Sequence, residues 1–206
     1  IYLAPDGALS WNLPTYIKTG SFSEYVSDPA KPVPYTEDVH FRRTREYMTD
    51  DQRFASRRPD VLTFETDVLD EDLTLAGPVI ANLKVSISGT DADFVVKVID
   101  VFPDNFQYSE ANSSPTGRSG VASYPMNGYQ MLVRGEIMRG KFRNSFTTPE
   151  PFKPNKIETV EFALPDVAHT FKKGHRLMIQ VQSSWFPLAD RNPQQFMNIY
   201  EAKPED

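Results

Sequence analysis

Cysteine is absent from the 206 residues of this chain. The absence excludes disulfide bonds and zinc sites built on cysteine ligands. No apolar run reaches the roughly 18 residues that a membrane-spanning helix needs, and no signal peptide is recognisable from Ile1 onward. Basic clusters are at most two residues long and the net charge is −6. Nucleic acid and membrane are therefore not expected as partners.

Long helices are not expected either. The 17 prolines are spread along the chain, and a proline inside a helix removes a hydrogen bond and clashes with the preceding turn. Aromatic residues make up 12% of the chain, and such residues favour strands. The whole chain, residues 1–206, is therefore interpreted as a single all-β domain.

Apolar and polar residues alternate with the period of a strand in several segments. The segment 94–102 is instead apolar on both faces apart from Lys97 and Asp100, which is typical of a central strand. Gly77-Pro78 and Lys173-Gly174 predict turns. Strands are expected at residues 1–3, 61–66, 73–75, 79–88, 94–102, 131–142, 156–164 and 177–182. Eight or nine strands without alternating helices predict a jelly-roll β-sandwich.

The first 60 residues show no such regularity. Residues 28–34 contain three prolines and must be extended, and residues 41–58 are rich in arginine. We expect residues 1–60 to form an irregular wrap over the surface. Ordered loops of this length are usually functional or lie at an interface.

No complete catalytic motif is present. The nucleophile elbow GxSxG is missing, and residues 117–120 (GRSG) have the wrong spacing. The three histidines have neither HxH nor HExxH spacing, so no metal site and no cofactor are expected. His169 and His175 are interpreted as structural, whereas His40, beside Phe41 in the irregular segment, is a candidate for an interface or pocket wall.

Two further patterns leave alternatives open. Acidic clusters at residues 67–72 and 91–93 are either solvated turns or oxygen ligands for calcium. Trp11, Trp185 and Phe186 could form a platform on which a sugar stacks. Trp185 and Phe186, however, directly follow an apolar strand, which favours a core or interdomain contact for both.

Five stretches carry a resemblance to a known family. They are residues 28–34 (DPAKPVP), 51–53 (DQR), 58–61 (RPDV), 93–104 (DFVVKVIDVFPD) and 173–192 (KGHRLMIQVQSSWFPLADRN). In order and spacing they resemble the C-terminal domain of the X-Pro dipeptidyl-peptidase and cocaine esterase family. α-Amino acid ester hydrolases and glutaryl-7-aminocephalosporanic acid acylases share this domain. The resemblance runs from Tyr2 to Asn192.

The resemblance implies a galactose-binding-like jelly roll that packs on an upstream α/β-hydrolase domain of the same polypeptide. That upstream domain carries the Ser-His-Asp triad, so this chain is expected to be non-catalytic within a serine hydrolase acting on a peptide, ester or amide. The positions that match best where the jelly roll borders the substrate pocket are His40 and Phe41. The basic pair Arg42-Arg43 departs from the glycine-rich or apolar stretch expected there.

The last residues of the chain are expected to lack a closing strand, and two alternative functions stay open. A further strand is expected after residues 198–200, so the final strand is interpreted as truncated, leaving an open sheet edge or one paired in a homo-oligomer. The main alternative function is a carbohydrate-binding jelly-roll module, and a weaker one is a calcium-stabilised adhesive domain. The compartment stays open, with a periplasmic or secreted location favoured over the cytoplasm.

Overall fold

The structure, a computed structural model, describes residues 1–14, 21–42, 44–108 and 125–203. Regular structure in these ranges is almost entirely β. The strands are β1 (Tyr2–Leu3), β2 (Leu9–Ser10), β3 (Val61–Glu65), β4 (Leu73–Val85), β5 (Asp93–Val101), β6 (Gln130–Arg139), β7 (Glu158–Phe171) and β8 (Arg176–Gln182). The helical pieces are α1 (Arg53–Ser56) and the 3₁₀ turns η1 (Pro5–Gly7), η2 (Glu46–Met48), η3 (Gly140–Phe142) and η4 (Ile199–Glu201). No helix in the described ranges is long and apolar enough to cross a membrane.

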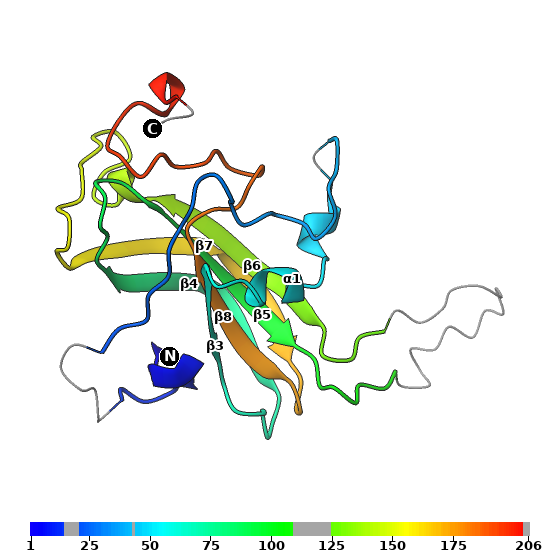
Figure 1. Ribbon diagram of the computed structural model, residues 1–206. Helices are drawn as coiled ribbons and strands as arrows, with labels where there is room; N and C mark the ends of the chain where they lie inside the picture. Colours follow the sequence, from blue (N-terminus) through cyan, green and yellow to red (C-terminus); the bar gives the residue numbers. More distant parts are fainter. Residues whose placement is uncertain (15–20, 43, 109–124, 204–206) are drawn as a thin grey trace.

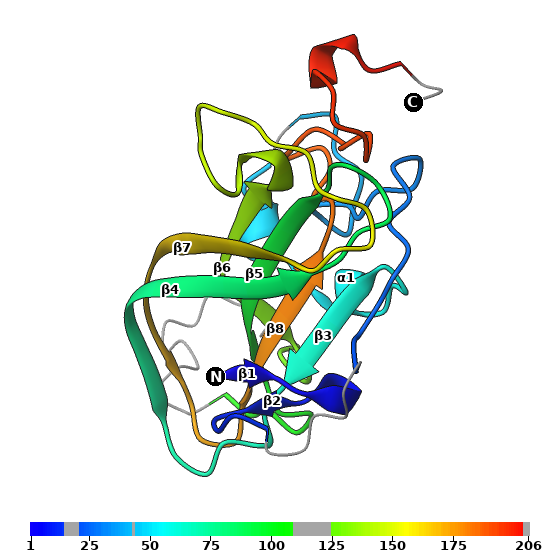
Figure 2. The same ribbon diagram turned by 90° about the vertical axis from the view of Figure 1, so that its left-hand side faces the viewer.

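The strands form two facing layers. A four-stranded sheet has the order β3-β8-β5-β6, with every neighbouring pair antiparallel. The long antiparallel pair β4–β7 crosses one face of this sheet, and α1 lies on the opposite face (Figures 1 and 2). The small β1–β2 pair lies beside β3 through a bridge between Ala8 and Glu65. The all-β, jelly-roll-type sandwich predicted from the sequence is confirmed.

The main core fills the space between the two layers, on what we call the inner face of the four-stranded sheet. Side chains alternate between the faces of a strand, so every second residue of β5, β7 and β8 points into this core. Its buried members are Leu9, Phe64, Ala81, Phe94, Val96, Val98, Met138, Phe152, Val160, Phe162, Leu164, Phe171, Leu177 and Val181. The alternation expected for residues 156–164 and 177–182 therefore does build the core.

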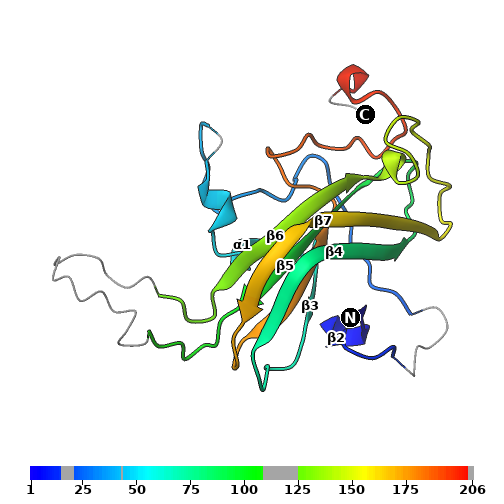
Figure 3. The ribbon, with the colours of Figure 1, turned by 180° about the vertical axis from the view of Figure 1, so that it is seen from behind.

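The outer face of the four-stranded sheet is covered by residues of the range 33–56, of which 33–42 and 44–56 are described; this range is here called the covering segment. Its first residues pair with the chain after β8: Phe186 donates its backbone N–H to Val33, and Tyr35 donates to Phe186, each at 2.9 Å. Val33 at this end and Ala55 at the other end both pack with Val61 of β3. The covering segment thus lies on the sheet as a partial third layer, on the far side of the sheet in the view of Figure 3.

One predicted turn is wrong. Gly77-Pro78 does not end a strand, because β4 continues through it with a register shift against β7 between Gly77 and Val79. Gly77 has φ +102, a conformation that glycine adopts without strain. Pro78 is tolerated because β4 is paired on one side only, and proline is confined to such edge positions.

Strand ends also differ from the sequence prediction. Residues 79–88 end as a strand at Val85, and 131–142 end at Arg139, where η3 begins. In contrast, β7 continues past Pro165 to Phe171, seven residues beyond the predicted end. The predicted turn at Lys173-Gly174 is present, with Gly174 at φ +89.

Candidate functional site

The covering segment contains a loop whose described residues are 37–42 and 44–50, which we call the exposed loop. Its two ends meet because Glu37 donates its backbone N–H to Asp50 Oδ2 at 3.3 Å. Inside it, Thr44 donates its backbone N–H to the hydroxyl of Tyr35 at 3.2 Å. Partial burial raises the pKa of Asp50. A loop whose ends are fixed in this way can hold its outermost residues in a defined position.

The outermost residues of the exposed loop are apolar. Val39 is 98% exposed and the side chain of Phe41 has no contact that removes it from solvent. His40, between them, is turned inward, and its Nε2 lies 3.2 Å from Glu46 Oε2. Large apolar side chains are rarely left fully exposed together unless they meet a partner. Of the two predicted pocket-wall residues, Phe41 is therefore outward and His40 supports the loop.

The base of the exposed loop rests on aromatic rings. The ring of Tyr47 lies 5.6 Å from that of Tyr35 and meets Trp185 edge-on at 6.0 Å. Trp185 is buried in this cluster together with Val95 of β5. Tyr47 of the exposed loop thus contacts Trp185, and the loop residue before it, Glu46, is the partner of His40.

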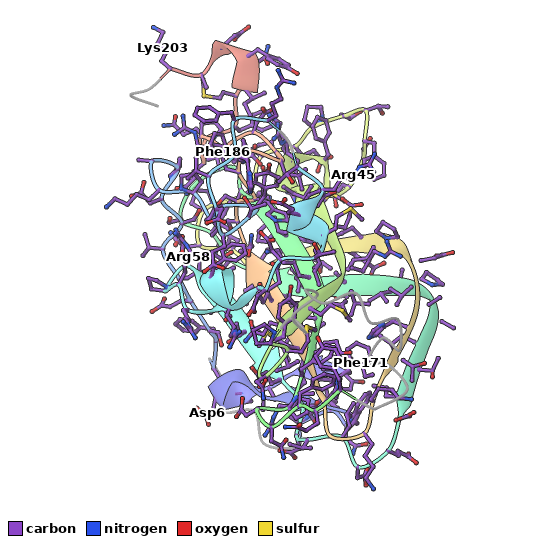
Figure 4. The ribbon with its side chains drawn as sticks, turned by 90° about the vertical axis from the view of Figure 1, so that its right-hand side faces the viewer. Asp6, Arg45, Arg58, Phe171, Phe186 and Lys203 are labelled. Atoms are coloured by element: carbon purple, nitrogen blue, oxygen red, sulfur yellow. The ribbon has the colours of Figure 1, made fainter. Side chains whose placement is uncertain are left out.

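Phe186 lies at the edge of the same region. Its ring is 38% exposed and lies 5.5 Å from the guanidinium of Arg191. Arg45, just before η2, and Phe186 lie toward the same end of the molecule, away from Phe171 in the core (Figure 4). The exposed loop and the chain around Phe186 therefore share one end of the sandwich.

Beneath the covering segment lies a group of buried side chains that we call the buried polar layer. Lys97, Gln180 and Gln182 project from the outer face of the sheet and have essentially no exposed surface. Lys97 Nζ donates to Gln52 Oε1 of the covering segment at 2.9 Å, and it lies 5.0 Å from the ring centre of Trp185. The members of the layer are Gln52, Lys97, Gln180, Gln182 and Trp185.

Close packing over Lys97 depends on a glycine. Gly135 of β6 is the register partner of Lys97. A Cβ atom at this glycine would lie 2.9 Å from Cη2 of Trp185, closer than van der Waals contact allows. The absence of a side chain at Gly135 is what lets the indole of Trp185 come this close to β6.

Two histidines predicted to be structural share one carboxylate. Asp100 of β5 is buried, with Oδ1 2.7 Å from Nδ1 of His175 and Oδ2 2.9 Å from Nε2 of His169. His169 belongs to β7, so this pair of contacts ties the two sheets together. Among the described residues, no histidine is hydrogen-bonded to a serine or threonine hydroxyl, which is the contact that activates a serine nucleophile.

The acidic clusters considered for calcium face basic groups where the structure places them. Asp72 accepts hydrogen bonds from the Lys172 amine and from the backbone of Lys173. Asp91 lies 3.8 Å from Lys141 Nζ, and Asp93 lies 3.5 Å from Arg139 Nε and accepts from Asn192. Burial raises the pKa of Asp93 to about 6. In the described part of the chain no group of three or more acidic, histidine or cysteine residues could hold a metal ion.

The two tryptophans considered for sugar stacking differ in environment. Trp185 is buried, whereas Trp11 is 54% exposed. Trp11 lines an open cleft of about 430 Å³ between β2 and the segment after β3. The polar residues that line this cleft with it are Ser10, Asn12, Thr66, Asp67 and Asp70. Residues 117–120 and Arg43, also singled out from the sequence, lie outside the described residues.

Sequence reasoning missed most of the buried polar layer. Lys97 was visible as a polar exception within an apolar strand, but its partner could not be found by spacing. Gln52 is 45 residues away from Lys97 in the chain. Tyr47 gave no signal, because nothing in residues 41–58 distinguishes a tyrosine that packs on Trp185 from one that faces solvent.

These features define an all-β sandwich domain whose described residues do not assemble a serine-hydrolase triad. The model of one protein family, the X-Pro dipeptidyl-peptidase C-terminal non-catalytic domain, matches residues 13–203. The chain therefore belongs to this family, as the five stretches of the sequence had suggested.

Relatives of this chain are hydrolases. It is 32% identical over 174 residues to cocaine esterase of Rhodococcus sp. (strain MB1 Bresler), covering 84% of this chain. Among solved structures, an aminopeptidase from a marine sediment Thaumarchaeota archaeon matches with a TM-score of 0.84 and 43% identity. An α-amino acid ester hydrolase matches with a TM-score of 0.84 and 44% identity, and each match covers 99% of this chain.

The relatives are longer proteins. This chain spans 26% of the cocaine esterase and 32% of each of the two solved structures. The part of those proteins that resembles this chain is thus one domain of a larger polypeptide.

Proposed function

We propose that this chain is the non-catalytic domain of a serine hydrolase and packs on an α/β-hydrolase domain upstream in the same polypeptide. The parent enzyme would hydrolyse a peptide, ester or amide acyl bond, as relatives named as an aminopeptidase, an esterase and an ester hydrolase do. Family membership and the chain's share of its relatives support this proposal.

We further propose that the exposed loop forms part of the wall of the substrate pocket. The observation that carries this step is the contrast within the loop: Tyr47 at its base is fixed among aromatic rings, while Val39 and Phe41 are presented to solvent. A rigid base with an apolar tip suits a surface that closes over the acyl part of a substrate. Arg42 beside the tip is exposed and adds positive charge.

The test compares two exposed phenylalanines in the full-length parent enzyme. Phe41→Ala is expected to raise KM for bulky acyl substrates about 10-fold, because a loss of about 1–2 kcal/mol accompanies removal of an apolar contact. Phe146→Ala, which truncates a ring that is 82% exposed in a different loop, is expected to leave KM unchanged. Equal KM values for the Phe41 variant and the unchanged enzyme would rule out a role in the pocket wall.

A second candidate function is glycan binding in the cleft beside Trp11. One half-exposed indole flanked by Asn12, Asp67 and Asp70 fits stacking of a sugar ring with hydrogen bonds to its hydroxyls. Burial of Trp185 removes the second aromatic ring that the sequence offered for such a platform. Glycan-array binding that is lost in Trp11→Ala and kept in Phe22→Ala would favour this function, and no binding by the unchanged chain would exclude it.

A further inference from the structure

Lys97 is a lysine that solvent does not reach. It lies at the middle of β5, one of the two inner strands of the four-stranded sheet, and its exposed fraction is 0%. Burying an amine that can carry a charge is costly unless a carboxylate neutralises it. Its position on the outer face directs the amine toward the covering segment rather than into the apolar core.

The surroundings of the amine contain no such carboxylate. From the covering segment it meets the Gln52 oxygen at 2.9 Å and the Phe54 ring at 5.9 Å, and from the chain after β8 it meets Trp185 at 5.0 Å. Its register partners on the flanking strands are Gln180 of β8 and Gly135 of β6. None of these neighbours, all of which are among the described residues, carries a charge. Burial accordingly lowers the pKa of Lys97 to about 7.

A continuous set of hydrogen bonds runs from this amine to the exposed loop. Gln52 accepts from Lys97 with its side-chain oxygen and donates Nε2 to the backbone oxygen of Asp50 at 2.9 Å. Asp50 in turn accepts the backbone N–H of Glu37, which closes the exposed loop. The titratable groups around Asp50 are Glu46, His40 and Asp38. The position of the loop ends is thus linked to the state of one buried amine.

The buried polar layer is incompletely satisfied. The oxygens Gln180 Oε1 and Gln182 Oε1 and the indole nitrogen of Trp185 are buried without a hydrogen-bond partner among the described residues. A neutral amine needs fewer acceptors than an ammonium, which has three N–H groups to satisfy. Gln52 is the acceptor in place. A proton taken up by Lys97 adds a charge as well as a donor. The unpaired oxygens of Gln180 and Gln182 can accept the donor, but no carboxylate among the described neighbours offsets the charge, so its burial stays costly unless water enters.

We propose that Lys97 is a positioning residue for the exposed loop, and that uptake of a proton by its amine releases the covering segment from the sheet. When the covering segment opens, water can hydrate the ammonium. The inner core stays packed, because local opening begins in the least stable part of a structure and unsatisfied buried groups lower stability. The effect on substrate rests on the proposed function of the loop. The movement of the segment does not depend on that function.

The movement can be measured by hydrogen exchange of the 206-residue chain at about pH 8 and about pH 6, with exchange times scaled to the intrinsic rate at each pH. Peptides from residues 37–56 are expected to lose about 10-fold in protection at the lower pH, in proportion to the rise in protonated Lys97. Peptides from β5 and β8 are expected to keep theirs. Equal protection of residues 37–56 at both pH values would overturn the proposal.

Two variants make the assignment to Lys97 specific. In Lys97→Met the protection of residues 37–56 should no longer depend on pH. In Gln52→Glu a carboxylate next to the amine should keep Lys97 charged at both pH values and remove the dependence by an independent route. The control variant Lys141→Met alters a buried lysine that is bound to the Met197 carbonyl. In this variant the protection of residues 37–56 should still depend on pH. Persistence of the dependence in both Lys97→Met and Gln52→Glu would contradict the role of Lys97.

Kinetics of the full-length parent separate this inference from the proposed function. Suppose that hydrogen exchange shows the pH-dependent opening while KM in that pH range is the same for the parent and its Lys97→Met form. In that case the pocket-wall function of the loop is wrong, and the release of the covering segment by Lys97 is supported. If Phe41→Ala raises KM but residues 37–56 show no pH-dependent opening, the release by Lys97 is wrong and the pocket-wall function is supported.

Discussion

The two faces of the four-stranded sheet are both buried, yet they are built differently. The inner face packs aliphatic and aromatic side chains against β4 and β7. The outer face places Lys97, Gln180 and Gln182 under the covering segment, with two amide oxygens lacking partners among the described residues. Apolar packing stabilises in proportion to buried area, whereas an unpaired buried polar atom costs about 1–3 kcal/mol.

This difference in packing means that the two faces of one sheet have different structural roles. The inner face holds the sandwich together, and the outer face holds a segment that can come away without unfolding it. The covering segment also makes apolar contacts through Val33, Ala55 and Tyr35. Its contact with Lys97, however, belongs to a partly satisfied polar layer, and moving loops are drawn from such less stable parts of a protein. Three substitutions test whether the two faces contribute to stability in these different ways.

The largest effect is expected on the inner face. Phe171, with no exposed surface, packs edge-on against His169 at 4.8 Å. Phe171→Ala is expected to lower the free energy of unfolding by about 3–5 kcal/mol, since it removes a buried ring and leaves a cavity. Phe146→Ala, at an exposed ring, should change it by less than about 0.5 kcal/mol. Unfolding in urea measures both, and similar losses in the two variants would show that the inner face is not the main source of stability.

On the outer face, a substitution is expected to raise the free energy of unfolding instead of lowering it. The pKa of Lys97 is about 7 in the folded chain against 10.5 for the model value, so the unfolded chain binds the proton more readily between these values. The resulting penalty is fully present below about pH 7 and disappears as the pH rises toward 10.5. Lys97→Met should therefore increase the free energy of unfolding by about 1–3 kcal/mol at neutral pH.

The pH series distinguishes this explanation from simple repacking. The gain in Lys97→Met should shrink steadily between about pH 7 and about pH 10. Lys84→Met, on the outward side of β4, should show a small change that is the same throughout. A gain that stays constant over the whole series would mean that the charge of Lys97 is not its cause.

The smallest effect concerns the fit of Trp185. Gly135→Ala places a methyl group against the indole and should cost about 1–2 kcal/mol, because the ring must shift. Trp185→Phe in the same chain removes the atom in conflict, so the double variant should lose less than the sum of the two single losses. Additive losses would show that the conflict lies elsewhere, and near-ultraviolet circular dichroism reports whether the ring has moved.

The inner face could be predicted largely from the sequence. Strict alternation at Val79, Ala81, Leu83 and Val85 is a local property, and each of these residues does point toward the core. The same local reasoning failed at Gly77-Pro78, because a dipeptide that makes turns in most contexts is also tolerated at an unpaired edge with a register shift. Whether β4 is an edge strand is decided by the topology.

The outer face could not be predicted in the same way. Lys97 stood out as an exception within β5, but the residues that explain it, Gln52 and Trp185, belong to segments far from it in the chain. His40 and Phe41 were singled out from the sequence, whereas the contact of Tyr47, in the same loop, with Trp185 emerges only from tertiary packing. The pocket-wall role of these residues stays a prediction.

The pairing of the covering segment with the chain after β8 has a consequence for synthesis. Val33 and Ser184, which share a hydrogen bond, are 151 residues apart. During translation the covering segment leaves the ribosome before β8 and cannot dock until β8 and the residues that follow it have been made. The closing of such a distant contact is slow. The apolar side of the segment, with Val33 and Ala55, must then stay exposed until those residues have been synthesised, and an exposed apolar surface on a nascent chain is open to aggregation or chaperone binding.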